Sequence, residues 1–270
     1  MIEVIEDYPI QEEINAVPIW WHSIPFGNGF SSSGVKSEQQ LNYEMNALHL
    51  PDLSGKTVLD IGAWDGFFSF EAEKRGAKKI VALDHYVWSL DLSPTFQYWE
   101  ECKRRGVIQK DPKTIPEFWH PDTLPGKKGF NTAKHLLSSK VEPVVGDFMQ
   151  MDISQLGEFD VVLYLGVLYH MENPFEAIKR VAKITREMAV IETLAMVIPL
   201  YENVPLCQFF ESNEVNHDVT NWWAPNLAGL ESLCRAAGFK EIKVFVGPPE
   251  QAKYRLRQIT HYRAIVQVWK

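Results

Sequence analysis

TVLDIGAWDGFF, at residues 57–68, contains a strand, a glycine-rich turn and the start of a helix. The run Thr57–Ile61 is mostly β-branched and apolar, which is typical of a strand that is covered on both faces. The turn at 62–66 follows, and apolar residues then recur at helical spacing. Such a unit occurs where a ligand lies against backbone at the carboxyl end of a parallel sheet. The stretch therefore predicts a ligand-binding α/β fold.

The same alternation of strand and helix continues along the chain. Further strands are expected at 80–84, 141–145, 159–166, 188–195, 240–247 and 261–270, and helices at 37–50, 66–76, 174–185 and 225–237. Alternation with short links predicts a doubly wound, mostly parallel sheet. The last two strands have no helical pattern between them, so we expect an antiparallel C-terminal hairpin at one edge.

The chain is expected to divide into two unequal parts. Residues 1–50 should form an N-terminal cap and a helix, ahead of a single domain at 51–270. Two insertions, at about 85–140 and 197–223, interrupt the domain. A connection as long as the first is usually functional or disordered. Its aromatic residues favour an ordered segment over the site.

Composition limits the class of protein. The chain has 270 residues, of which 46% are hydrophobic and 23% are charged, and these are ordinary values for a globular protein. Its three cysteines lie far apart, and neither a long apolar run nor an export signal is present. We therefore expect a cytoplasmic protein with no membrane segment. A formal charge of −8 argues against broad binding of nucleic-acid phosphates.

Acidic residues stand at the ends of three expected strands, namely Asp60, Asp84 and Asp147. Asp84 closes the strand after the glycine turn, where a carboxylate commonly accepts hydrogen bonds from ribose hydroxyls. Asp147 follows the next strand and suits an adenine amino group. Gly62 and Gly66 lack the side chains that would keep a ligand away from the backbone. Together, these residues predict an adenosine pocket.

The glycine turn also distinguishes between adenosine cofactors. A dinucleotide places its pyrophosphate on a helix N-terminus through the pattern G-x-G-x-x-G. Here Trp64 occupies the middle glycine position and Asp65 adds a negative charge, so bulk and charge both oppose a pyrophosphate. A sulfonium, in contrast, is favoured by nearby carboxylates. We therefore expect S-adenosyl-L-methionine rather than a nicotinamide dinucleotide.

The order of VLDIGAWDG, VALD, GD and DVVLYLGVLYH resembles that of class I S-adenosylmethionine-dependent methyltransferases. More narrowly, LGVLYHMENPFEAIKRV, ETLAM and DVTNWWAPNLAGLESLCRAAGF are similar to the tRNA wobble-uridine (5-hydroxyuridine-34) methyltransferase family and its uncharacterised relatives. The resemblance extends from about Trp20 to the end of the chain. It implies a Rossmann-like fold with a seven-stranded sheet.

The resemblance also implies how the cofactor is held. Asp60 and Gly62 would bind its methionine end, and Asp84 its ribose. The remaining expected contacts are Asp147 with Phe148 at the adenine, Leu165 and Gly166 along the methionine chain, and the neighbouring residues Ala63, Trp64, His85 and Gly146.

The acceptor is the least determined part of the prediction. The carboxymethyl transferase of this family binds the carboxylate of carboxy-S-adenosylmethionine through a basic residue near its N-terminal region, whereas the first basic residue here is Lys36. A buried carboxylate without a cation is costly, so ordinary S-adenosylmethionine is expected. Basic clusters at 103–105, 127–128 and 253–257 are expected to be solvated surfaces.

We therefore expect methyl transfer to an O or N atom of a small-molecule metabolite. A tRNA wobble-uridine (carboxy)methyltransferase and a non-catalytic S-adenosylmethionine-binding protein are the alternatives. The sequence leaves the oligomeric state open. It shows no metal-ligand spacing, so transfer without a metal is expected.

Three residues are candidate catalytic groups. His170 follows a strand end and should lie near the reacting methyl, although it could instead pack against or cap the helix at 174–185. His22 lies in the aromatic stretch IWWHSIPF, where it could close over a substrate or only order that loop. Glu192, at the outward end of a strand, could bind a substrate group or form a structural ion pair.

Aromatic side chains supply most of the expected substrate contacts. The alternative for the tryptophans is packing beneath a loop. The expected substrate-binding residues are Trp21, Tyr169, Asn221, Trp222 and Trp223.

Overall fold

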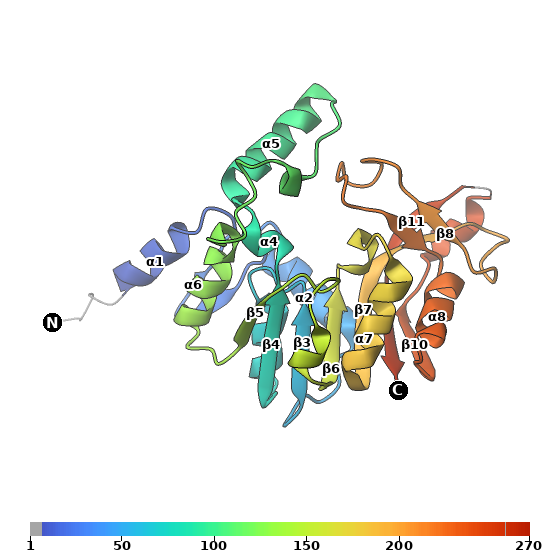
Figure 1. Cartoon of the computed structure of the whole chain (residues 1–270), viewed down its shortest axis with the longest axis horizontal. Coiled ribbons are helices and arrows are strands. Elements are labelled where there is room, and N and C mark those ends of the chain that lie inside the picture. Colours follow the sequence, from blue (N-terminus) through green and yellow to red (C-terminus); the bar gives the residue numbers. More distant parts are fainter. Residues whose placement is uncertain (1–6, 257) are drawn as a thin grey trace.

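The structure is a computed structural model that describes residues 7–256 and 258–270. Residues 1–6 of the expected N-terminal cap, and Arg257 of the basic cluster at 253–257, lie outside the described residues. The centre of the fold is a seven-stranded sheet with the strand order β10-β11-β7-β6-β3-β4-β5 (Figure 1). Its strands are β3 (Thr57–Ile61), β4 (Lys79–Asp84), β5 (Glu142–Val145), β6 (Phe159–Leu165), β7 (Thr185–Val197), β10 (Glu241–Val246) and β11 (Thr260–Trp269).

The pairing of the strands confirms the predicted fold class. β5, β4, β3, β6 and β7 pair in parallel, whereas β11 pairs antiparallel with both β7 and β10. The C-terminal hairpin therefore closes one edge of a mostly parallel sheet, as expected of a class I methyltransferase fold. β7 is longer than predicted because it begins directly after the preceding helix, at Thr185.

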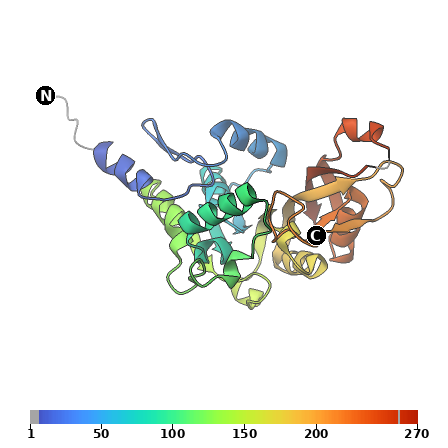
Figure 2. The same ribbon diagram turned by 90° about the horizontal axis from the view of Figure 1, so that it is seen from above.

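Helices cover both faces of the sheet. Side chains of α2 (Glu38–Leu48), α3 (Phe67–Lys74) and α6 (Lys128–Leu136) share one core cluster. Those of α7 (Pro174–Ile184) and α8 (Leu227–Ala236) share the other. Seen from above, the blue α2 and the yellow α7 lie on opposite sides of the molecule (Figure 2). The sheet is therefore doubly wound, as the alternation predicts.

Local side-chain chemistry fixes where these helices begin. The Ser37 hydroxyl accepts a hydrogen bond from the first turn of α2, and Asn173 and Asn226 cap α7 and α8 in the same way. Leu41 and Leu48 are buried on one face of α2, as predicted. The helix expected at 225–237 begins slightly later, because β9 (Trp223–Pro225) precedes its cap.

The insertion at 85–140 is more helical than the sequence suggests. It contains α4 (Tyr86–Ser89), α5 (Leu92–Arg105), α6 and the short 3₁₀ helices η1 (Pro112–Thr114) and η2 (Pro125–Lys127). The 14-residue helix α5 was not predicted. A C-terminal signal for it was present, since three basic residues precede Gly106, which adopts the left-handed conformation.

Small elements complete the fold. In the insertion at 197–223, β8 (Cys207–Phe209) pairs with β9 in a two-stranded ribbon. The N-terminal segment contains α1 (Asp7–Asn15) and a separate ribbon of β1 (Pro25–Gly27) and β2 (Phe30–Ser31). Further 3₁₀ helices are η3 (Ile153–Leu156), η4 (Leu168–His170) and η5 (Glu250–Tyr254). Within the described ranges, no helix combines the length and apolar character that a membrane crossing requires.

Candidate active site

The glycine turn after β3 is shaped by packing as well as by its backbone. Gly62 and Gly66 adopt φ values of +81° and +88°, which favour glycine. A Cβ atom on Gly66 would lie 2.7 Å from the Phe70 and Phe130 rings, and one on Gly62 would lie 2.5 Å from Val167. Packing against Val167, Phe70 and Phe130 thus gives a second reason for glycine at these positions, beside the expected approach of a ligand to the backbone.

Asp65 attaches the N-terminal segment to this turn. One carboxylate oxygen accepts hydrogen bonds from the backbone N–H groups of Trp21 (2.9 Å) and His22 (2.8 Å), and the other pairs with the His22 ring. Asp65 and His22 are only 2% and 4% exposed. The Trp21 ring stacks on Trp64, with 4.4 Å between ring centroids. We call the Asp65–His22 pair with these backbone bonds the Asp65 clip.

The Asp65 clip changes the expectation about the charge of Asp65 and bears on the role of His22. The negative charge of Asp65 was expected to repel a pyrophosphate, but His22 and two N–H groups compensate that charge inside the protein. The bulk of Trp64 remains the obstacle. The engagement of His22 with Asp65 favours its loop-ordering role over a role as a catalytic base.

Two buried carboxylates lie at the carboxyl ends of neighbouring strands. Asp84 accepts hydrogen bonds from the Trp64 N–H (2.9 Å) and the Val87 N–H (3.1 Å), and burial raises its pKa. Asp60 accepts a hydrogen bond from the Ser69 hydroxyl at 2.6 Å. Burial raises the pKa of Asp60 to about 6, although the Ser69 bond and nearby His22 lower it. For both carboxylates, the cost of burial therefore outweighs the hydrogen bonds that stabilise the charged form.

These residues fit a positively charged adenosine cofactor. No cationic side chain of residues 7–256 and 258–270 forms an ion pair with Asp60 or Asp84, and a buried carboxylate without a cation is costly. The buried Trp64 Nε1–H has no hydrogen-bond partner there either. A ligand that carries a positive centre and hydrogen-bond acceptors would satisfy both groups.

Of the two expected adenine contacts, only Asp147 lies beside the carboxyl end of β4. The Gly146 N–H donates to the Asp84 carbonyl oxygen at 3.2 Å, which places Asp147 beside the end of β4. Phe148, in contrast, is buried in the core cluster of α7, with its ring 6.0 Å from that of Tyr164. His85 packs its ring edge-on against Trp119.

A second group of polar residues surrounds Gly166, at the end of β6. The Gly166 N–H donates to the Glu192 carbonyl oxygen at 3.0 Å, and both Glu192 carboxylate oxygens accept from the Arg263 guanidinium. Arg263 also lies over the Tyr169 ring, 4.7 Å from its centroid. Leu165 is half-buried against the core. Glu192 therefore forms the ion pair that was its alternative role.

Arg263 is a site residue that the sequence analysis missed. The antiparallel register of β11 with β7 places it opposite Leu194, on the same face as Glu192. The charge of Glu192 was visible in the sequence, but its cationic partner lies 71 residues away. Only the strand register could have identified the pair.

The insertion at 197–223 is tied to η4. The Trp222 N–H donates to the Tyr169 carbonyl oxygen at 2.8 Å. His170 Nδ1 lies 3.0 Å from the Thr220 carbonyl oxygen and 2.9 Å from Thr220 Oγ1, which donates to Asp218 at 2.7 Å. Burial lowers the pKa of His170, whereas nearby Asp218 raises it.

The other residues predicted from this insertion have different surroundings. Asn221 is buried and donates to the Val215 carbonyl oxygen at 3.0 Å, while its own side-chain oxygen has no partner in the described residues. Trp222 stacks on Phe209, and Trp223 donates to a backbone carbonyl oxygen at 3.1 Å. This geometry favours loop packing for the two tryptophans.

The two insertions approach each other beyond the carboxyl ends of the parallel strands. Tyr86 of α4 donates to Asp111 at 2.7 Å. Burial and Asp111 raise the pKa of Tyr86, and Asp218 of the other insertion adds to this effect. Figure 1 shows α5 and the β8 segment beyond the same ends of the strands, at the top of the sheet in that view. We call Tyr86, Asp111, Tyr169, His170 and Asp218 the acidic mouth.

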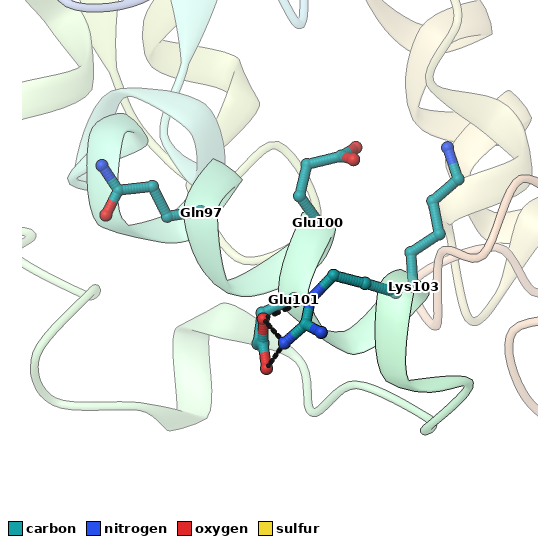
Figure 3. Close-up of a pocket in the computed structure, with 5 residues that line it drawn as sticks. Gln97, Glu100, Glu101 and Lys103 are labelled. Atoms are coloured by element: carbon teal, nitrogen blue, oxygen red, sulfur yellow. Dashed lines mark hydrogen bonds and ion pairs between the residues drawn. The ribbon is translucent and has the colours of Figure 1, made fainter.

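A separate hollow lies on the surface of α5 (Figure 3). Its walls come from that one helix, and a Glu101–Arg104 ion pair at 2.7 Å closes one side. None of its residues stands at the end of a strand, so it is not part of the candidate site. No three His, Cys, Asp or Glu side chains of the described residues gather as metal ligands.

Comparison with known proteins agrees with the fold. Residues 38–244 match a family model described as a methyltransferase domain. The fold is that of the class I S-adenosylmethionine-dependent methyltransferases, as predicted. The chain belongs to the methyltransferase domain family.

Curated relatives at low identity share one name. The tRNA U34 carboxymethyltransferase of Psychrobacter sp. (strain PRwf-1) is 27% identical over 232 residues, which are 83% of this chain and 58% of the relative. That of Campylobacter hominis is 23% identical and covers 90% of this chain and 73% of the relative. The chain thus spans less than two thirds of the length of the Psychrobacter relative.

Among solved structures, the N-terminal domain of EvdMO1, determined in the presence of SAH and D-fucose, has a TM-score of 0.58. It is 17% identical to this chain, and the match covers 98% of this chain and 97% of that domain. This likeness supports the fold.

Proposed function

We propose that the protein transfers a methyl group from S-adenosylmethionine to an O or N atom of a small-molecule metabolite. The acidic mouth is the observation that favours a small molecule as the methyl acceptor. It contains two carboxylates, Asp111, which lies 3.4 Å from Lys113 Nζ, and Asp218. This excess of negative charge favours a small acceptor over nucleic-acid phosphates, which need cations. Its aromatic side chains suit a compact organic acceptor.

The cofactor supplies an activated methyl group on a positively charged sulfur. Asp60 and Asp84 would face its positive methionine end and its ribose, and the Trp64 indole N–H would donate to it. The chain would then align the acceptor with the methyl carbon. Alignment alone is equivalent to roughly 7–11 kcal/mol of the barrier.

The second candidate function is (carboxy)methylation of a tRNA wobble uridine. The name of the curated relatives and the presence of Arg263 near Gly166 favour it. Its guanidinium is a cation that could pair with the extra carboxylate of carboxy-S-adenosylmethionine. The sequence had indicated no such cation. Glu192 already compensates this charge, however, which weakens Arg263 as a carboxylate ligand.

One labelling experiment tests these candidates together. The protein is incubated with deuterium-methyl S-adenosylmethionine and, separately, with a metabolite extract and with total tRNA. We expect mass spectrometry to find the label in a small molecule. Label that enters only tRNA would overturn the proposal. Tight cofactor binding by calorimetry without transfer to either fraction would instead identify a non-catalytic binding protein.

A further inference from the structure

The hydrogen bonds around His170 determine which ring nitrogen carries the hydrogen. The Thr220 carbonyl oxygen, 3.0 Å from Nδ1, can only accept. Thr220 Oγ1, 2.9 Å from Nδ1, gives its own hydrogen to Asp218 Oδ1 at 2.7 Å. Asp218 is held in place because the same oxygen also accepts from the Thr220 N–H at 2.8 Å. Both neighbours of Nδ1 are therefore acceptors, and Nδ1 is the protonated nitrogen.

This arrangement leaves Nε2 of His170 as a base. A neutral imidazole has one N–H, so Nε2 keeps a free lone pair when Nδ1 is protonated. Burial lowers the pKa of His170, which keeps the ring neutral near pH 7. Within the described ranges, Nε2 has no hydrogen-bond partner.

We infer that Asp218 and Thr220 are positioning residues that hold His170 as the general base for a hydroxyl acceptor. This inference rests on the proposed function and narrows its acceptor atom to oxygen. A hydroxyl oxygen is a weak nucleophile until its proton leaves, so it requires a base. A neutral amine already has an available lone pair and gains less from one.

The acceptor oxygen forms a bond to the methyl carbon while the carbon–sulfur bond breaks, and that bond's electron pair stays on sulfur. The hydroxyl proton passes to Nε2 of His170. The imidazolium formed in this way is stabilised by Asp218 through Thr220, and it later returns the proton to water. This is the logic of a base oriented by a third group.

Four charged or titratable side chains act on this ring from the elements packed against it. Asp218 of the second insertion raises the pKa of His170, and Arg263 of β11 lowers it. Tyr169, on the same turn, packs 4.3 Å from the His170 ring. Glu192 pairs with Arg263 and so reduces the influence of the guanidinium. Asp218 is thus the group whose removal should change the titration most clearly.

The test is nitrogen NMR of the ligand-free protein with ¹⁵N-labelled histidine, in which His170→Gln assigns the signals. We expect Nδ1 protonated and Nε2 unprotonated at pH 7. Asp218→Asn keeps the hydrogen-bond acceptor but loses the charge, and Thr220→Val loses the hydroxyl. Both should move the titration of His170 to lower pH, whereas Thr220→Ser should keep the wild-type titration.

A kinetic arm then uses the acceptor found by labelling. His170→Gln should slow transfer by about 10²–10⁴-fold. Asp218→Asn should lower the maximal rate and also shift the acid limb of the rate profile to lower pH, which a merely structural role would not do. A protonated Nε2, or a titration unchanged in Asp218→Asn, overturns the inference. So does a product methylated on nitrogen. The NMR arm needs no turnover, so it stands even if the proposed function fails.

Discussion

At the scale of single residues, the site is dominated by carboxylates that the protein does not fully compensate. Asp60 and Asp84 are buried at adjacent strand ends, and their pKa values rise because burial disfavours the charged form. A positively charged ligand would reverse this cost. The uncompensated charge of these two carboxylates can be tested by unfolding at several pH values and by cofactor binding, neither of which needs a methyl acceptor.

Asp60 should make stability depend on pH. Its pKa of about 6 in the folded protein lies above the value of 3.8 for an unperturbed group, so the folded state binds the extra proton between about pH 4 and 6. Stability should therefore fall as the pH rises through this window, by about 3 kcal/mol. Asp60→Asn, which keeps an acceptor for Ser69, should show a smaller fall, since Asp84, whose pKa burial also raises, keeps its own contribution. Denaturant unfolding at several pH values checks it, and parallel curves for the two proteins would contradict it.

Asp84 should contribute directly to cofactor affinity. Asp84→Asn removes the charge and keeps an acceptor for only one of the Trp64 and Val87 N–H groups, because these donate to different carboxylate oxygens. We expect binding of S-adenosylmethionine to weaken by about 1–3 kcal/mol in calorimetry. Asp152→Asn, at an exposed helix cap, is the control. Equal affinity of a folded Asp84 variant and wild type would rule out the assignment.

At the scale of elements, local signals were predictable and register was not. β3, the glycine turn and α3 follow from twelve consecutive residues, because a covered strand and a helix have different apolar periods. The helix α5 was missed because prolines on its C-terminal side made the whole insertion read as irregular. The Glu192–Arg263 pair depends on how β11 aligns with β7, which no local pattern specifies.

One strand side chain also caps a distant helix. The buried Gln267 of β11 donates to the Leu48 (2.9 Å) and His49 (2.7 Å) carbonyl oxygens at the end of α2. Gln267→Met would keep the volume but leave these carbonyl groups without a partner. We expect a loss of about 1–3 kcal/mol in the free energy of unfolding. Gln251→Met, at an exposed position, should change stability little, and equal losses in both variants would contradict the capping role.

At the scale of the whole molecule, the Asp65 clip joins the N-terminal segment to the methyltransferase domain. The sequence indicated a cap over the site, but not that Asp65 would hold it, since His22 lies 43 residues away. Composition and strand order together predicted the fold class. The contacts between distant segments required the assembled structure.

Breaking the clip should destabilise the whole protein. His22→Ala removes the side chain that pairs with the buried Asp65 carboxylate, and breaking such a buried pair typically costs about 3–5 kcal/mol. Asp65→Asn together with His22→Ala should cost less than the sum of the single changes, because no buried charge is then left unpaired. Unfolding of the four proteins in denaturant measures this coupling. Strict additivity would show that the pair is not energetically linked.

The clip also bears on the order of events during turnover. The clip holds the Trp21 and His22 backbone against the glycine turn. If the nucleoside lies against that turn as proposed, we expect the acceptor to cover it from the side of α4 and η4. A bound acceptor would then obstruct exchange, so the methyl donor should bind first and its spent form should leave last. Product-inhibition patterns should show a compulsory sequence, and random addition of the two substrates would mean that a second exit exists.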